Sequence, residues 1–441
     1  MRRSLAILGM LLALATPAGA EELPVRSLGT GQGLSQSSVN AVFRDSTGFL
    51  WFATQDGLNR YDGYSIKVYR HDGADSSSLP DNYLWRLAPA RNGGFWIGTF
   101  KGGLALYDPA RDAFGSFQHH QEDSTSLSED NVTAVHQDPD GTLWVGTWFG
   151  GLNRHARPDP FSAQGGFNHY VAHSPGRGAL SDNRVSAIVR DSGGTLWIGT
   201  WRGLNRLNEQ TGEVLQLLHD PADPHSLGGD AIWAMTVDRA GRLWIATWGS
   251  GLSMLDPGTL RCKNFRHDPD DPGSIASDLL RTVLVDPDGT VLVGTYGAGL
   301  DRLNPRTGVF AHIRHDPFDP TSIPSDEIQS LYRDARGMLW IGTASGAASH
   351  HRYRSKVRAF RHSPVQPGTL SDDRITAVHV DGEGGLWVGT HGKGLNYRAP
   401  GSDDFLAFHH NPDDAASLSS DLITAVLRQR DGTLWVGTRG A

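Results

Sequence analysis

Cysteine, positive charge and long apolar runs are all scarce in this chain. Its 441 residues contain one cysteine, Cys262, so no disulfide can form within the chain. The formal net charge is −8 at pH 7, which argues against a general affinity for nucleic acid or for anionic membranes. No apolar run approaches the roughly 18 residues of a transmembrane helix. Stability must therefore come from a large core, which some 420 residues can supply.

The first twenty residues have the pattern of a secretory signal peptide. Arg2 and Arg3 give a charged start, Leu5 to Ala15 is apolar, and Ala18-Gly19-Ala20 is a small-residue cleavage site. We expect cleavage after Ala20 and export of the mature chain, with residues 1–20 outside the folded part. No cysteine follows the apolar stretch, so a lipid anchor at this end is not expected.

One short strand-like motif recurs nine times. Its copies include FLWFAT, GFWIGT, TLWVGT and MLWIGT, with steps of 45 to 53 residues between their central positions. Those central residues are Trp51, Trp96, Trp144, Trp197, Trp244, Leu292, Trp340, Trp387 and Trp435. A fixed period of this size is the signature of a repeat architecture.

Within one period the pattern predicts four short strands. In the stretch from Gln137 to Val185, Asp140-Gly141 marks a tight turn, Gly150-Gly151 a second one, and a polar loop leads to the next unit. No helical periodicity is present. Four antiparallel strands joined by Gly- and Asp-rich turns are typical of one β-propeller blade.

The number of repeats predicts two rings. Nine blades exceed the usual range of about four to eight, and the seventh repeat departs from the others after Thr343. We therefore expect an all-β fold: a seven-bladed propeller of four-stranded blades over residues 21–355, followed by the first two blades of a second propeller over residues 356–441. Leu23 to Leu28 aligns with an outer strand and should close the first ring by pairing into its last blade. The last repeat stops at Ala441 before its outer strands, so we expect a truncated chain.

The repeats resemble the two-component regulator propeller family. The similarity rests on Gly33-Leu34-Ser35, on Val39 to Val42 and on the run from Asp45 to Gly63, and it recurs through the mature chain. The resemblance implies a periplasmic sensor with two seven-bladed propellers, then a β-sandwich, one membrane helix and a cytoplasmic kinase or diguanylate cyclase. Characterised members sense oligosaccharides, and a full-length homodimer would fit this plan. This chain shows no sandwich, membrane helix or output module.

The position directly after the repeated threonine is the best candidate for ligand binding. Five consecutive repeats place an aromatic there, at Phe100, Trp148, Trp201, Trp248 and Tyr296, and Lys101 and Arg202 follow two of them. This position should lie on the face that carries the long loops, near the central channel. Aromatic rings edged by positive charge suit stacking on sugar rings and hydrogen bonding to hydroxyls or an acid group. The alternative is that the rings only cap glycine turns. Weaker candidates on the same face are Trp85, Trp233, Arg184, Arg281 and Arg374.

Other conspicuous residues are expected to be structural. The repeat tryptophans should pack between neighbouring blades, since Leu292 replaces one of them. Eight histidines share one repeat position, which keeps them too far apart to bind one metal, so they should cap strand ends. No EF-hand, phosphate loop, Gly-x-Ser-x-Gly or kinase signature is present. We expect no catalytic residue, metal or cofactor.

Three functions remain open at this point. The first is the periplasmic ligand-sensing region of a transmembrane signalling protein, a hybrid sensor histidine kinase or alternatively a diguanylate cyclase. The second is a secreted propeller enzyme such as a polysaccharide lyase or glycosidase, and the third is an interaction scaffold. In the first, the partner is a small molecule or oligosaccharide, with no nucleic acid and with membrane attachment only through a missing C-terminal helix.

Overall fold

The computed structural model describes residues 23–161, 166–172, 178–351, 360–429 and 431–440. The predicted signal peptide, His173 and most of the basic stretch after His351 lie outside these ranges. The chain forms two compact units, Met1–Arg352 and Tyr353–Ala441. Apart from one short 3-10 helix, η1 (Thr30–Gln32), all regular structure in the described residues is β-strand. The described part contains no helix long and apolar enough to cross a membrane.

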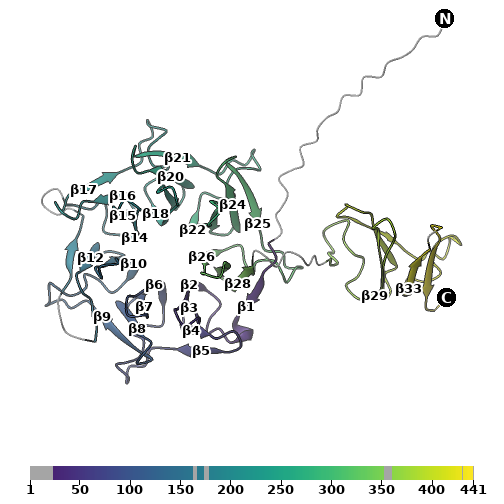
Figure 1. Cartoon of the computed structure of the whole chain (residues 1–441), viewed down its shortest axis with the longest axis horizontal. Coiled ribbons are helices and arrows are strands. Elements are labelled where there is room, and N and C mark those ends of the chain that lie inside the picture. The colour runs from purple at the N-terminus through teal and green to yellow at the C-terminus, as the bar shows by residue number, and fades with distance from the viewer. Residues whose placement is uncertain (1–22, 162–165, 173–177, 352–359, 430, 441) are drawn as a thin grey trace, which may run out of the picture. The chain divides into compact units, whose positions relative to one another are not determined.

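The first unit consists of seven four-stranded antiparallel sheets, here called blades 1 to 7, which surround a common axis (Figure 1). Blade 1 is β2 (Val39–Arg44), β3 (Leu50–Thr54), β4 (Gly57–Tyr61) and β5 (Ile66–Tyr69). Blade 2 is β6 (Leu84–Pro89), β7 (Phe95–Thr99), β8 (Leu104–Asp108) and β9 (Ala113–Phe117). Blade 3 is β10 (Val132–Gln137), β11 (Leu143–Thr147), β12 (Leu152–His155) and β13 (Asn168–Tyr170). Blade 4 is β14 (Val185–Arg190), β15 (Leu196–Thr200), β16 (Gly203–Leu207) and β17 (Val214–Leu217).

The remaining blades follow the same order from the inner to the outer strand. Blade 5 is β18 (Ile232–Val237), β19 (Leu243–Thr247), β20 (Leu252–Asp256) and β21 (Arg261–Phe265). Blade 6 is β22 (Leu280–Val285), β23 (Val291–Thr295), β24 (Leu300–Asn304) and β25 (Val309–Ile313). Blade 7 is β26 (Ile328–Arg333), β27 (Met338–Thr343), β28 (Gly346–His351) and, as its outer strand, β1 (Arg26–Leu28). The all-β propeller fold that the sequence predicts is thus confirmed.

The ring closes through its first strand. β1 pairs antiparallel with β28, with Arg26 opposite Ser349 and Leu28 opposite Ala347. Neighbouring inner strands contact one another all the way round, and β26 of blade 7 meets β2 of blade 1. The closing strand that the sequence predicts between Leu23 and Leu28 is therefore present. It covers the edge that β28 would otherwise expose.

The second unit is described by itself. It contains one four-stranded sheet of β29 (Ile375–Val380), β30 (Leu386–Thr390), β31 (Leu395–Arg398) and β32 (Phe405–Phe408). A two-stranded sheet of β33 (Ile423–Arg428) and β34 (Leu434–Thr438) follows. The inner-strand register is the same as in the first unit, with Ile375 opposite Thr390 and Ile423 opposite Thr438.

The repeat tryptophans form the cores between blades of the ring, as predicted. Trp51 is fully buried and its ring lies 4.8 Å from Phe95 and 4.7 Å from Tyr107 of blade 2. In blade 6 the equivalent position is Leu292, which is 4 % exposed. An apolar side chain of either shape suits the position because its role is to fill the space between two sheets.

An aspartate at the first turn of most blades organises that turn. Asp45 Oδ1 accepts hydrogen bonds from the backbone N–H of Thr47, Gly48 and Phe49, and Oδ2 accepts one from Trp51 Nε1 at 2.8 Å. Asp138 bonds Trp144 Nε1 in the same way. These acidic turns thus have a structural role.

These aspartates also join neighbouring blades. Arg190 of blade 4 donates from Nε and Nη2 to the two carboxylate oxygens of Asp138 in blade 3. Arg333 pairs with Asp286 in the same arrangement. Arg44 of blade 1 reaches Asp334 of blade 7 at 2.9 Å, so one of these pairs spans the closure of the ring.

Acid should weaken the ring through Asp138. Burial acts to raise the pKa of this carboxyl, but hydrogen bonds from Arg190 and Trp144 outweigh it and the pKa is lowered. A carboxyl whose folded pKa lies below its unfolded value stabilises the fold above the unfolded pKa, and this contribution is lost as the pH falls through the folded pKa. We expect the wild type to lose more stability than Asp138→Asn between about pH 5 and pH 2. Urea unfolding across this range measures the difference; Asp140→Asn, exposed in the same turn, should follow the wild type.

Two glycines of blade 3, one in the repeated motif and one in the turn that follows it, lie where a larger residue would clash. Gly151 has φ of 83°, and a Cβ there would lie 2.4 Å from the carbonyl oxygen of Tyr170. At Gly146, inside the repeated motif, a Cβ would lie 2.5 Å from Cγ1 of Val185 on the next inner strand. The first glycine makes the turn and the second lets the blades approach closely near the axis.

Candidate ligand-binding site

A bulge near the start of every inner strand shapes the candidate site. In each blade the register of the inner strand shifts at its second residue. We call these seven residues the bulge ring: Asn40, Trp85, Thr133, Ser186, Trp233, Arg281 and Gln329. A β-bulge leaves one residue without a ladder partner and re-aims its side chain. The same backbone irregularity thus frees seven side chains, of six kinds, at one end of the ring.

The five predicted aromatics lie beside the bulge ring, and together they are called the aromatic rim. Each donates its backbone N–H to the carbonyl of the residue just before the inner strand of the same blade. The distances are 2.9, 3.0, 3.1, 2.7 and 2.9 Å for Phe100, Trp148, Trp201, Trp248 and Tyr296. This hydrogen bond repeats whatever the side chain is, so the backbone sets the position and the side chain is free to vary.

Four of the rim residues join Trp233 in one continuous group. Ring centroids are 5.2 Å apart for Trp148 and Trp201, 6.0 Å for Trp201 and Trp233, 5.4 Å for Trp233 and Trp248, and 5.2 Å for Trp248 and Tyr296. The rings come from blades 3 to 6. Tyr296 is 42 % exposed and the tryptophans are half-buried, so the group presents ring surface to solvent.

Phe100 belongs to a second aromatic group in blade 2. Its ring lies 5.2 Å from Tyr83 and 6.4 Å from Trp85. A cavity of about 150 Å³ connects the two groups. It is lined by Trp85, Arg86, Phe100, Asn131, Thr133, Trp148, Ser186 and Trp233. The structure therefore brings all five rim residues to one face, as predicted, together with the weaker candidates Trp85 and Trp233.

Arg281 lies against the rings rather than in bulk solvent. Its guanidinium carbon is 5.1, 5.5 and 4.7 Å from the ring centroids of Trp233, Trp248 and Tyr296. Nη1 donates to Oε1 of Gln329 at 2.7 Å, and Nη2 lies 3.7 Å from Oε1 of Glu327. Burial lowers the pKa of Arg281 despite the nearby Glu327. The side chain is a cation held in place over three aromatic faces.

The other basic residues that the sequence suggested as candidates differ from Arg281 in their contacts and exposure. Arg184 stacks on Trp201 at 5.4 Å, but Asp182 neutralises it through Nη2 at 2.7 Å. The Lys101 ammonium lies 5.4 Å from the Phe100 ring centroid, and both Lys101 and Arg202 are exposed. Arg374 is in the second unit, so it does not belong to this face of the ring.

Several buried polar atoms on this face have no hydrogen-bond partner among the described residues. They are Trp85 Nε1, Asn131 Oδ1, Trp201 Nε1 and Arg281 Nε. A buried polar group left unpaired costs about 1–3 kcal/mol. Such groups are expected where a ligand or ordered water completes the hydrogen bonding.

The sequence reasoning missed Arg86. It follows Trp85 of the bulge ring, at a position where the other six blades have a small residue. Those residues are Ala41, Ala134, Ala187, Ala234, Thr282 and Ser330. Aligning the nine repeats residue by residue would have found it, because a long cation interrupts a column of small side chains.

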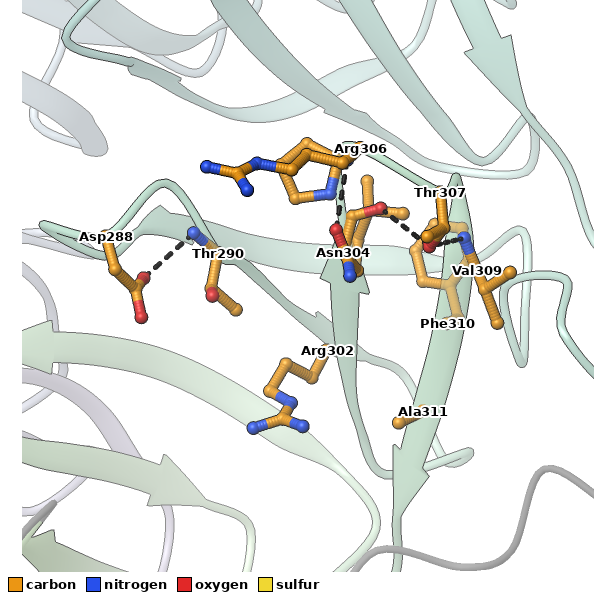
Figure 2. A pocket seen from close by; sticks show the side chains of 11 residues that line it. Asp288, Thr290, Arg302, Asn304, Arg306, Thr307, Val309, Phe310 and Ala311 are labelled. Atoms are coloured by element: carbon orange, nitrogen blue, oxygen red, sulfur yellow. Dashed lines mark hydrogen bonds between the residues drawn. The ribbon is translucent and has the colours of Figure 1, made fainter.

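A larger cavity lies elsewhere and is a poor candidate. It has about 710 Å³ and lies over β24 and β25 at the outside of blade 6, next to the turn of residues 304–308 (Figure 2). There the local turn uses the polar groups: Asn304 Oδ1 accepts from Arg306 N–H at 3.0 Å, and Thr307 Oγ1 from Val309 N–H at 3.3 Å. This groove has no stacked aromatics, so size alone does not make it a ligand site.

The repeated histidines are structural, as predicted. In His71, His119, His219, His267, His315, His362 and His410, Nδ1 bonds the carbonyl oxygen eight residues later, at distances from 2.5 to 2.8 Å. Except for His362, which no described outer strand directly precedes, each one ties the end of an outer strand to the loop that leads to the next blade. Across the described ranges no cluster of three or more His, Cys, Asp or Glu side chains could hold a metal ion.

Comparison with known proteins explains the repeat. A family model described as two component regulator propeller matches residues 33–56, 126–149, 179–202, 226–249, 322–345, 369–392 and 417–440. The chain belongs to the two-component regulator propeller family. In the ring the matched segments lie in blades 1, 3, 4, 5 and 7, and each runs from the loop before the inner strand to the second residue after the repeated threonine.

Two of the structural neighbours are extracellular domains of two-component systems. The chain is similar to that of BT3049 from B. thetaiotaomicron, named as a hybrid two component system, with 26 % identity and a TM-score of 0.74 over 95 % of this chain and 52 % of that one. It shares the fold of the extracellular domain of BT4673 from the same organism, also named as a hybrid two component system, with 22 % identity and a TM-score of 0.60 over 95 % and 51 % of the chains.

A curated relative has a shorter match. Histidine kinase P4 of Formosa agariphila is 41 % identical over 73 residues, which are 17 % of this chain and 5 % of that protein. The chain thus spans about half the length of these two extracellular domains, and the alignment covers a small part of the kinase. These comparisons show a propeller domain similar to the extracellular domains of two-component systems.

Proposed function

We propose that this chain is the periplasmic ligand-sensing region of a transmembrane two-component protein, most simply a hybrid sensor histidine kinase, and that its aromatic rim binds an oligosaccharide. The single observation that carries the ligand part is the continuous group of partly exposed rings from Trp148 to Tyr296. Pyranose rings present apolar C–H faces, which stack on aromatic faces, and hydroxyls, which need polar partners such as the unpaired Trp201 Nε1.

The proposed role in signalling is supported by the proteins to which this chain is similar. The neighbour with the higher TM-score is an extracellular domain of a protein named as a hybrid two component system, and the curated relative is named as a histidine kinase. Residues that line the two cavities near the axis include Trp, Arg, Asn and Ser but no His, Asp or Glu in the described part. This lining suits binding more than acid–base catalysis.

Removing two rim rings should abolish binding without unfolding the ring. Trp148 and Trp201 are half-buried and reach past the core clusters, so the double variant Trp148→Ala, Trp201→Ala should weaken saccharide binding at least roughly 30-fold, at about 1–3 kcal/mol for each stacked ring. Calorimetry with cellohexaose, maltohexaose and trigalacturonate measures binding, and the melting temperature should change little.

A control separates lost stacking from a general effect. Tyr64→Ala removes an aromatic ring that is 99 % exposed and distant from the rim in sequence, and it should bind as the wild type does. If the wild type binds none of the three saccharides, the proposed ligand class is wrong. A large fall in melting temperature of the double variant would instead make Trp148 and Trp201 core residues.

A further inference from the structure

The axis of the ring holds a cavity with an unusual charge. It has about 270 Å³ and is lined by residues of all seven inner strands. Most of them are small or apolar, such as Ala41, Ala134 and Ala187. Arg86 and Arg281 are the two charged residues among the described residues that line it, and no Asp or Glu is among them. In a chain with a net charge of −8, this is a local concentration of positive charge.

Arg86 lacks a partner for its charge. None of the described residues forms a hydrogen bond or an ion pair with its guanidinium, in contrast to Arg44 and Arg190, which have Asp partners. Burial and the nearby positive charge of Arg281 lower the pKa of Arg86 to about 10. The Arg86 side chain is half-buried and lines the axial cavity, and a cation withdrawn from bulk water without a counter-charge is costly for the fold. An arginine in this state is better explained by an anion that it binds than by a contribution to stability.

The repeat itself shows that the fold does not need this arginine. Four of the other blades have alanine at the position of Arg86, and the remaining two have Thr282 and Ser330. Blades 2 and 6, which contribute the two arginines, lie outside the matched family segments in the ring. The cation pair is thus a departure of two particular blades from the common repeat, on a backbone that the other blades share.

We propose that Arg86 and Arg281 bind the acidic group of the ligand, a carboxylate or sulfate, in this axial cavity while the aromatic rim stacks on its sugar rings. The ligand class is then an acidic oligosaccharide, and this inference rests on the proposed saccharide binding. Arg86 also lines the 150 Å³ cavity between Trp85, Phe100, Trp148 and Trp233, so the cation site and the stacking surface are continuous. A guanidinium fork matches the two oxygens of a carboxylate or sulfate.

The test measures binding of ligands that differ in their charged groups to variants that each lack one arginine. Trigalacturonate carries carboxylates, its fully methyl-esterified form has the same rings without charge, and N-acetylgalactosamine 4-sulfate carries a sulfate alone. Arg86→Ala places at this position the residue that most blades already have, so it should fold with an unchanged or higher melting temperature. Arg239→Ala, an exposed arginine in a turn of blade 5, removes the same charge elsewhere.

We expect Arg86→Ala to weaken trigalacturonate binding roughly 10- to 100-fold while changing binding of the methyl ester less than about twofold. Arg86→Lys should recover part of the loss because it keeps the charge without the fork. Arg239→Ala should bind both ligands as the wild type does. A matching loss with the sulfated sugar would assign the site to sulfates as well, and its absence would restrict it to carboxylates.

Failure of this inference differs from failure of the proposed function. If the wild type binds the methyl ester and trigalacturonate equally and Arg86→Ala changes neither, saccharide binding stands and the anion site is wrong. If neither trimer binds but sodium sulfate changes tryptophan fluorescence in the wild type and not in Arg86→Ala, the anion site stands and the saccharide proposal is wrong. If none of these probes binds, both are wrong.

Discussion

Trp144→Ala is expected to lower the free energy of unfolding of the ring by about 3–5 kcal/mol, the range for removal of a large buried aromatic. Trp144 is fully buried between blades 3 and 4. Its Nε1 also donates to Asp138, so the substitution leaves a cavity and removes one hydrogen bond of a buried carboxylate. Urea unfolding followed by circular dichroism measures the change as a lower midpoint.

The chain provides a matched control for this variant. Residues 433–438 repeat the sequence Thr-Leu-Trp-Val-Gly-Thr of residues 142–147, yet Trp435 is 59 % exposed. Trp435→Ala should therefore change stability by about 0.5 kcal/mol or less. We interpret the repeat tryptophan as stabilising the packing between blades rather than the strand in which it lies. Equal losses of stability in Trp144→Ala and Trp435→Ala would contradict this interpretation.

Asp334→Ala should destabilise the ring by about 3–5 kcal/mol, the cost of removing one partner of a buried ion pair. The Asp334 side chain is fully buried and accepts hydrogen bonds from Arg44 Nε and from the backbone N–H of Arg336 and Met338, each at 2.9 Å. Its loss leaves Arg44, 16 % exposed, without its carboxylate at the junction of blades 7 and 1. The same urea experiment measures the effect.

An exposed ion pair gives the comparison for Asp334. The Lys67 ammonium lies 2.8 Å from Asp112, but these side chains are 49 % and 45 % exposed. Lys67→Ala should cost about 1 kcal/mol or less because solvent screens the pair. If Asp334→Ala costs no more than Lys67→Ala, the inter-blade pair does not hold the ring closed.

The sequence predicted the architecture because the same strand and turn pattern recurs in every repeat. The period located each blade, and the displaced Leu23–Leu28 segment located the closing strand, which the structure shows as β1. Trp51 and Leu292 were correctly placed in the core because position in the repeat, and not residue type, decides their burial. These features follow from local pattern alone.

The candidate site was predicted only in part. The rim residues were found because an aromatic recurred after the repeated threonine, and the structure brings them to one face. Arg86 was missed because the inner strand was interpreted as a packing element. A single arginine at a position where most blades have alanine does not form a repeating pattern, so the repeat did not draw attention to it. The contact of Arg281 with three rings from two blades could not be predicted, since it depends on the bulge that turns its side chain toward the rim.

The pairing of β1 with β28 sets the order in which this ring can be completed. Arg26 and Ser349 are separated by more than 320 residues, so the first strand to be synthesised has no partner until almost the whole ring has been made. Contacts of such long sequence separation form late, because loop closure must be achieved before they stabilise anything. Blades 1 to 6 can form one after another as the chain emerges, whereas blade 7 acquires its outer strand only at the end. The slowest folding step of the ring should therefore be its closure, and until then β28 offers an open edge to other chains.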